Sequence, residues 1–408
     1  MLSLSLSLSL SLSLSFRVCG SMAMESPNFS FGTSLQVPNV QELAKEHMIT
    51  VPPRYMRPDQ DPTIVVDPIT SLSEIPIIDM EKLLLRESGA SELDRLHSAC
   101  KHWGFFQVSL SLSLIRWDPP SRWVKDQLVN HGVSSTLVEK MKLEIQEFFK
   151  LPLEEKKKYC QKEGDVEGLG QAFVVSEEQK LDWGDMFFLN TLPPHLRKPH
   201  LFDDLPPSFR ETLGTYAVEL KKLAMAILGF MARALGMKVE EMRELFEEGF
   251  QSMRINYYPP CPRPESVIGL SPHSDSVGLT ILLQISEIEG LQIKKDRMWI
   301  PVKPRPNAFI INIGDILEIV SNGMYRSIEH RATVNSMHER LSIAAFHSPK
   351  LTGDIGPAPS LISTQTPPQF RHVSVETYFK ELFTRKLAGK AYVDYFRIDH
   401  GEGNASTN

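Results

Sequence analysis

The run Phe309-Ile310-Ile311-Asn312-Ile313, together with three similar runs, decides the fold class of this chain. From about Ser252 onward, short β-branched or alternating apolar runs are separated by Gly, Pro and Asn, which is typical of strands joined by turns. The other runs lie at residues 279–283, 291–293 and 299–302. They predict a chain that is mainly β with some α, with a β-sandwich or barrel in its second half.

The half before Ser252 follows the helical period instead, and residues that favour helix N-termini precede its apolar stretches. Helices are predicted after Asn39, Ser91 and Ser134, from Ser208 with Glu211 as a capping box to Gly236, and at 375–383; the run 75–78 predicts a strand. In the longest helix an apolar stripe predicts core packing, with a cofactor or partner groove as the alternative. The stripe consists of Leu220, Leu223, Ile227, Phe230, Met231 and Ala234.

Composition narrows the class of protein. The 408 residues are 42% hydrophobic, which is enough for one large globular domain or two ordinary ones. A formal charge of -6 gives no broad basic field and argues against a nucleic-acid partner. The four scattered cysteines form no CxxC pair, which fits neither a zinc site nor a disulfide framework. The cysteine pattern indicates a reducing, intracellular setting, so we expect a cytoplasmic protein. We also expect it to be monomeric by default and to have no membrane partner.

Two segments look foreign to a folded domain. Residues 1–23 begin with alternating Leu and Ser, which we interpret as low-complexity sequence from a leader read through, with Met22 or Met24 as the working start. Residues 108–127 contain a second Leu-Ser run and interrupt a strand-like stretch, Phe105 to Gln107 and Leu128 to Val129. Because Val codons start with GT and CAG encodes Gln, this segment has the form of an intron retained in frame. A regulatory loop is the alternative.

The motif Pro272-His273-Ser274-Asp275 carries the first chemical signal. In extended chain the imidazole and the carboxylate lie on the same face, so both can bind one metal ion. A third ligand would complete the 2-His-1-carboxylate triad that leaves three positions open on Fe(II). His330 is the candidate for that ligand. Each residue alone would more often be an ordinary polar residue, and only their combination is informative.

Arg340 follows ten residues after His330 and is joined by Ser342, on a predicted strand whose other face is aliphatic. An arginine that points into a barrel is costly unless an anion pairs with it, and its guanidinium matches a carboxylate in two parallel hydrogen bonds. A dicarboxylate held there could present its other end to the iron. An internal Arg-Glu salt bridge is the alternative.

The order and spacing of these motifs resemble those of the plant soluble 2-oxoglutarate/Fe(II)-dependent dioxygenases. The run Asn256-Tyr257-Tyr258-Pro259-Pro260-Cys261-Pro262 is similar to the motif that precedes their H-x-D. The strings GQAFVVSEEQKLDWGDMFF, EGLQIKK, NAFIINIGDILEI and YRSIEHRATVNS resemble the senescence-related-gene branch, which includes codeine O-demethylase-like proteins. The resemblance covers residues 37–398 apart from 108–127.

This resemblance implies a double-stranded β-helix, or jelly roll, as the core, with a helical N-terminal domain and a C-terminal helix. The expected segments are the leader 1–23, an N-terminal extension 24–73, a mostly helical domain 74–248 interrupted by 108–127, the jelly roll 249–350, and a C-terminal helix and tail 351–408.

The resemblance also assigns roles to residues. It implies Fe(II) on His273, Asp275 and His330, and 2-oxoglutarate on Arg340 and Ser342. Tyr258 and Asn256 match co-substrate positions, and Phe346 and Phe173 match positions that often line the substrate pocket.

The implied reaction uses O2, with ascorbate as reductant. It hydroxylates or O-demethylates an alkaloid, flavonoid or related aromatic, and releases succinate and CO2. The alternatives are an iron-triad oxidase that does not use 2-oxoglutarate, and an inactive, mis-spliced or binding-only homologue.

Both foreign segments can be tested on the natural gene product. We expect the spliced transcript to lack the codons for residues 108–127, and peptide mapping of the natural protein to find no peptide from the Leu-Ser leader. Mature transcripts that contain those codons, or a peptide that spans the leader, would contradict the interpretation.

Overall fold

The computed structural model describes residues 34–45, 50–58, 74–84, 89–109, 132–382 and 389–398. The predicted leader, and most of the predicted insertion, lie outside the described residues. Three of the four cysteines lie within them, and all three are free thiols, as expected from their spacing. No helix in this part of the chain is both long enough and apolar enough to cross a membrane.

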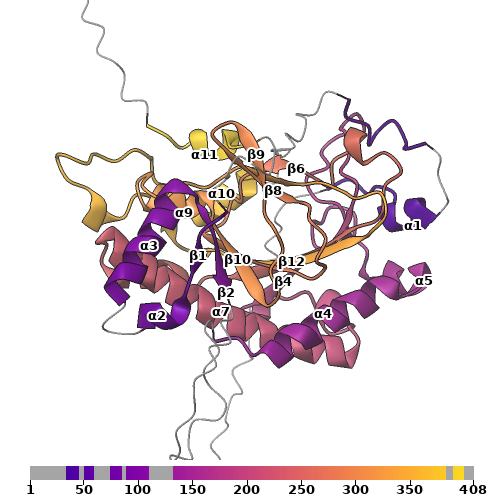
Figure 1. The fold of residues 1–408 in the computed structure, drawn as a ribbon, viewed down its shortest axis with the longest axis horizontal. Helices are drawn as coiled ribbons and strands as arrows, with labels where there is room; N and C mark the ends of the chain where they lie inside the picture. Colours follow the sequence, from indigo (N-terminus) through magenta and orange to yellow (C-terminus); the bar gives the residue numbers. More distant parts are fainter. Residues whose placement is uncertain are drawn as a thin grey trace, which may run out of the picture. The chain divides into compact units, whose positions relative to one another are not determined.

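Two β-sheets form the centre of the described structure (Figure 1). The larger one has the strand order β1 (Ile77–Ile78), β2 (Phe105–Ser109), β10 (Ala308–Ile313), β7 (Leu279–Gln284), β12 (Arg340–His347), β5 (Gln251–Tyr258), β4 (Asp185–Leu192), β3 (Gly168–Gly170). The smaller one has the order β6 (Leu270–His273), β11 (His330–Ala332), β8 (Leu291–Lys295), β9 (Met298–Pro301). A short pair, β13 (Asp354–Ile355) and β14 (Val373–Ser374), lies apart.

The two sheets share one apolar core, which confirms the predicted jelly roll. Phe105 and Ile310 come from the larger sheet, and Ile293 and Ile300 come from the smaller one; all four are buried in the same cluster. Burial of such side chains contributes about 1.5–3 kcal/mol each. The four apolar runs predicted from the sequence are strands β7 to β10, with ends that differ by one or two residues.

Helices make up much of the rest of the described structure. They are α1 (Val40–Lys45), α2 (Met80–Leu84), α3 (Gly89–His102), α4 (Ser135–Lys150), α5 (Leu153–Lys156), α6 (Pro199–Phe202), α7 (Pro207–Leu235), α8 (Val239–Phe246), α9 (Asp315–Val320), α10 (Val375–Leu382) and α11 (Ala391–Asp394). Helix α7 contacts α3, α4, β4, β7 and β12, and therefore backs the strands that carry the site. The predicted apolar stripe of α7 is buried except for Ala234, which confirms core packing.

The predicted helix starts were only partly correct. Asn39 caps α1 as predicted, because its Oδ1 accepts the backbone N–H of Glu42 at 2.9 Å. The capping box of Ser208 and Glu211 was wrong: α7 begins one residue earlier at Pro207, where a proline lacks only a hydrogen bond that the first turn does not need. The hydroxyl of Ser208 bonds Glu144 instead.

The start of α3 differs from the prediction, whereas that of α4 is confirmed, because α4 begins at Ser135, directly after Ser134. Helix α3 already includes Ser91, since it runs from Gly89. Ser134 precedes α4 without a side-chain cap. The strand predicted at 75–78 is limited to Ile77 and Ile78, because Pro76 has no N–H to donate to a ladder.

The strand before the predicted insertion extends into it. Val108 is fully buried and pairs with Ile78 on one side and Phe309 on the other, and the pairing continues to Ser109. A buried β-branched valine suits a central strand, which explains why β2 does not end at Gln107. The predicted continuation through Leu128 and Val129 lies outside the described residues, and the boundaries at 248 and 350 stay predictions. Strands β1 to β4 nevertheless come from the N-terminal half and complete the sheet.

Helix α7 offers a matched pair of glycines for a stability test. Gly236 ends the helix at φ 68°, a left-handed conformation, whereas Gly229 lies inside the helix; an added Cβ would meet nothing within 4 Å at either position. We expect Gly236→Ala to destabilise the fold by about 1 kcal/mol and Gly229→Ala to stabilise it by roughly 0.5–1 kcal/mol. Thermal denaturation followed by circular dichroism measures both, and shifts of the same sign would contradict this account.

Candidate metal and co-substrate site

Three potential metal ligands converge where the smaller sheet ends. Strand β6 ends at His273, and the antiparallel register places His330 of β11 directly opposite it. Asp275 follows two residues later, and its Oδ1 lies 3.5 Å from His273 Nε2 and 3.7 Å from His330 Nε2. The ligand atoms of all three buried residues lie within 4.8 Å of one another. One divalent cation can therefore bind all three.

The surrounding hydrogen bonds leave these same three atoms available. His273 Nδ1 donates to the carbonyl oxygen of Ser271 at 2.7 Å, and His330 Nδ1 donates to that of Ile328 at 3.1 Å. Each imidazole therefore carries its lone pair on Nε2, the tautomer that binds a metal.

The second oxygen of Asp275 is held away from the cluster. Its Oδ2 accepts hydrogen bonds from Thr280 Oγ1 at 2.6 Å and from Asn312 Nδ2 at 2.7 Å. Oδ1 is thereby the oxygen left to bind a cation.

The pKa shifts of Asp275 and His330 also favour metal binding. Burial alone would raise the pKa of the Asp275 carboxyl, but the imidazoles of His330 and His273 and the bond from Thr280 hold that pKa below its usual range. Burial, together with the charge of His273, lowers the pKa of His330 to about 4. An ionised carboxylate beside a neutral imidazole is the protonation state that metal binding requires.

The predicted co-substrate residues lie on neighbouring strands of the larger sheet. Strands β12 and β5 pair so that Arg340 lies opposite Tyr258, and Ser342 lies opposite Asn256. Asn256 Nδ2 lies 3.5 Å from Ser342 Oγ. All four residues line one inner cavity together with the three metal-ligand candidates.

Arg340 is buried without a carboxylate partner among the described residues. One of its Nη atoms donates to Gln284 at 3.0 Å, its Nε has no hydrogen-bond partner, and its guanidinium lies over the Tyr258 ring. The predicted alternative, an internal Arg-Glu salt bridge, was therefore wrong. Burial lowers the pKa of Arg340, but a guanidinium stays charged in a protein. The cavity thus contains a cation that an anionic ligand would compensate.

A second, mostly apolar cavity lies on the outer side of the metal-ligand cluster. It has an empty volume of about 740 Å³, part of it open to solvent. Phe346 lines both cavities, whereas Phe173 lines the outer one and not the inner one, and its backbone adopts φ 63°. The outer cavity is also lined by Val166, Met186, Phe188, Phe250, Phe379 and Leu382. His273 and Asp275 lie between the two spaces, so a molecule in the outer cavity would lie next to the metal-ligand cluster.

The sequence analysis missed three residues of the site. Thr280 and Asn312 orient Asp275 from strands β7 and β10, and Arg254 of β5 lines both cavities while its Nε donates to Asn256 Oδ1 at 2.7 Å. Asn312 left a signal, since it is the single polar residue in the run Ala308–Ile313. Thr280 and Arg254 lie in strands where neither residue type is unusual.

Comparison with known proteins agrees with this geometry. The family model described as the 2OG-Fe(II) oxygenase superfamily matches residues 249–349. The model described as the non-haem dioxygenase in morphine synthesis N-terminal matches residues 75–111 and 126–208. The unmatched residues 112–125 lie inside the predicted insertion.

Plant enzymes are similar over most of their length. The oxoglutarate-dependent flavonoid 7-O-demethylase 1 of Ocimum basilicum is 54% identical, over 91% of this chain and 94% of its own. Protein SRG1 of Arabidopsis thaliana is 53% identical, over 92% of this chain and 100% of its own. Codeine O-demethylase of Papaver somniferum is 49% identical, over 92% of this chain and 100% of its own.

A solved structure of JOX2 in complex with 2OG, Fe and JA has a TM-score of 0.76 and 36% identity, and the match covers 89% of this chain and 98% of that one. Fold, family models and relatives therefore agree with the geometry of the site. The chain belongs to the 2OG-Fe(II) oxygenase superfamily, in the branch that includes Protein SRG1 and codeine O-demethylase.

Proposed function

We propose that this 2-oxoglutarate- and Fe(II)-dependent dioxygenase hydroxylates or O-demethylates a small aromatic specialised metabolite, with the iron on His273, Asp275 and His330. The observation that carries the assignment is the convergence of two Nε2 atoms and one carboxylate oxygen whose neighbouring polar atoms are already hydrogen-bonded. Three ligands on one face leave room for a chelating keto acid and O2.

The bound iron and 2-oxoglutarate supply the oxidising chemistry, with succinate and CO2 as co-products. The protein supplies position and a dry environment. Arg340 and Ser342 bind the distal carboxylate of 2-oxoglutarate, with Tyr258 and Asn256 beside them. In this arrangement the keto-acid end would lie near the metal ligands, which line the same cavity.

The outer cavity supports an aromatic substrate. Its walls carry five phenylalanine rings, which suit a flat apolar molecule, and His273 and Asp275 at its inner end bring the reacting bond close to the iron. Phe346 and Phe173 are the pocket residues that we assign to substrate binding. Similar enzymes are named for the O-demethylation of a flavonoid, codeine and thebaine, so an aryl or alkyl methyl ether is the substrate class we infer.

The remaining features of the proposal follow from composition and family. We propose ascorbate as the reductant that keeps the iron ferrous, a monomeric enzyme, and a cytoplasmic location. Neither nucleic acid nor a membrane is part of the proposed function.

A second enzyme class, an iron-triad oxidase without 2-oxoglutarate, is less well supported because Arg340 would then remain buried without an anion. A non-catalytic homologue is also less well supported, since every residue of the proposed iron and co-substrate sites is present in one place.

A panel of methoxylated flavonoids and alkaloids tests the proposed reaction. We expect at least one compound to stimulate succinate formation with a matching yield of formaldehyde or of a hydroxylated product. The variants His273→Ala and Asp275→Ala should lose this turnover by at least about 100-fold, since each removes a metal ligand. Succinate and product are quantified together by mass spectrometry.

The exposed His338 provides the matched control, because His338→Ala removes an imidazole that lies outside the cavities. Turnover in either ligand variant equal to that of His338→Ala would refute the iron assignment. If no compound of the panel stimulates succinate formation while the protein still binds iron, the proposed substrate class is refuted and the iron assignment is not.

The role of Arg340 can be separated from that of the iron ligands. Arg340→Lys keeps a charge but loses the two-pronged geometry, so we expect the KM for 2-oxoglutarate to rise at least about tenfold, and further in Arg340→Met. Fe(II) affinity without co-substrate should stay unchanged in both variants. The exposed Arg305, which pairs with Glu74, supplies the control Arg305→Met. An unaltered KM in Arg340→Met would exclude this residue as the anchor.

A further inference from the structure

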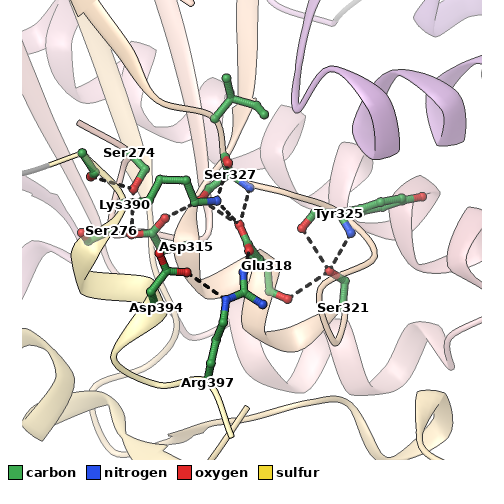
Figure 2. A network of polar contacts seen from close by, with 12 residues as sticks. Ser274, Ser276, Asp315, Glu318, Ser321, Tyr325, Ser327, Lys390, Asp394 and Arg397 are labelled. Carbon is green, nitrogen blue, oxygen red and sulfur yellow. Dashed lines mark hydrogen bonds and ion pairs between the residues drawn. The ribbon is translucent and has the colours of Figure 1, made fainter. Parts of the chain in front are cut away.

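Two buried carboxylates lie behind the metal-ligand cluster and belong to neither cavity. Asp315 and Glu318 are on helix α9, and both are fully buried (Figure 2). A carboxylate in this environment requires a cation or several hydrogen-bond donors, because the cost of its lost hydration is several kcal/mol. The groups that stabilise these two carboxylates therefore indicate which parts of the chain must pack here.

The compensating cations come from the end of the chain. We call residues 389–398 the C-terminal segment. Lys390 Nζ donates to Glu318 Oε2 at 2.5 Å and to the carbonyl oxygen of Ser327 at 2.6 Å. Arg397 donates to the other oxygen, Glu318 Oε1, and also to Asp394 at 2.8 Å (Figure 2). Glu318 is thus held between two cations from one segment.

Asp315 also contacts residues 272–275, which include two of the proposed iron ligands. The backbone N–H of Asp315 donates to the carbonyl oxygen of Asp275 at 2.7 Å, and Asp315 Oδ2 accepts the hydroxyl of Ser274 at 3.1 Å. Ser327 links the two acids: its hydroxyl donates to Asp315 Oδ1 at 2.5 Å, and its backbone N–H donates to Glu318 Oε2 at 2.8 Å. A continuous chain of hydrogen bonds therefore joins Lys390 to the loop 272–275.

The C-terminal segment also contacts that loop directly. Gly389 N donates to the carbonyl oxygen of Pro272, and Ser274 N donates to that of Gly389, both at 3.2 Å. These two bonds flank His273, and Gly389 adopts φ 56°, which favours glycine. Lys390, the next residue, anchors this contact through Glu318.

We propose that Lys390 is a positioning residue for the iron: its ion pair with Glu318 docks the C-terminal segment, and the docked segment holds His273 and Asp275 in their metal-binding arrangement. This proposal rests on the iron site proposed above. Groups that orient metal ligands in this way typically change metal affinity by about 10- to 100-fold when they are removed. Helix α10, just before the segment, lines the outer cavity through Phe379 and Leu382, so the chain end also borders the substrate space.

The test uses the full-length apo protein and Co(II), whose visible absorption reports the ligand geometry. We expect Lys390→Met to weaken Co(II) affinity about 10- to 100-fold and to alter the absorption spectrum of the folded protein, with Lys390→Arg restoring both. The control Lys380→Met removes an exposed lysine of α10 that pairs with Glu376, and should bind Co(II) as the wild type does. Ser274→Ala keeps the ion pair and the backbone contacts but removes the hydroxyl bond from the loop to Asp315, and should weaken Co(II) binding as well.

A role in stability alone would lower the melting temperature of Lys390→Met and leave Co(II) affinity and spectrum as in the wild type, which would overturn the proposal. If Lys390→Met does not fold, Lys390→Met combined with Glu318→Gln replaces it, because a neutral amide at position 318 does not need the charge of the lysine. Wild-type Co(II) affinity in that double variant would equally overturn it. Failure of the iron site is a separate result: the wild type would bind Co(II) no better than His273→Ala.

Discussion

The metal-ligand cluster depends on the hydrogen bonds that hold His273, Asp275 and His330 in place. Backbone carbonyls accept from Nδ1 of both histidines, while Thr280 and Asn312 occupy one oxygen of the carboxylate. Three atoms remain, and they lie close enough to share one cation. Because these donors belong to β7, β10 and the ends of β6 and β11, the cluster forms only when both sheets pack together. The jelly roll is therefore the means by which the ligand set is preorganised.

The inner cavity, the outer cavity and the region around α9 differ in how their buried charges are compensated. The inner cavity combines an ionised Asp275 with a buried Arg340 that has no carboxylate partner among the described residues, so it suits a ligand that is itself anionic and binds a metal. The outer cavity has aromatic walls that suit an apolar molecule. Glu318, behind the cluster, is compensated by the chain itself through Lys390 and Arg397, and Asp315 accepts hydroxyl hydrogen bonds from Ser274 and Ser327. Uncompensated charge is thus found in the cavity that we propose for a ligand, whereas compensated charge is found where the chain stabilises its own geometry.

Local patterns predicted the elements well where one interaction dominates. The apolar runs of β7 to β10 are strands because burial of one or both faces decides their conformation, and Gly236 ends α7 because only glycine adopts φ 68° without strain. Predictions failed where two local signals compete. Helix α7 begins at Pro207, so Ser208 and Glu211 do not form the predicted capping box. Strand β2 includes Val108 and therefore continues beyond its predicted end. Strands β3 and β4 were missed, since their apolar residues show no clear alternation.

The sequence by itself determined the chemistry: two imidazoles, a carboxylate, and an arginine with a serine on one strand face, in an order that resembles one enzyme family. Period-two alternation was enough to place Arg340 and Ser342 together, because neighbours on a strand face are local in sequence. Only the tertiary structure decided that His330 lies opposite His273, that Thr280 and Asn312 orient Asp275, and that Lys390 reaches Glu318. These contacts join residues far apart in the chain, and their geometry depends on sheet register and packing, which no local pattern encodes.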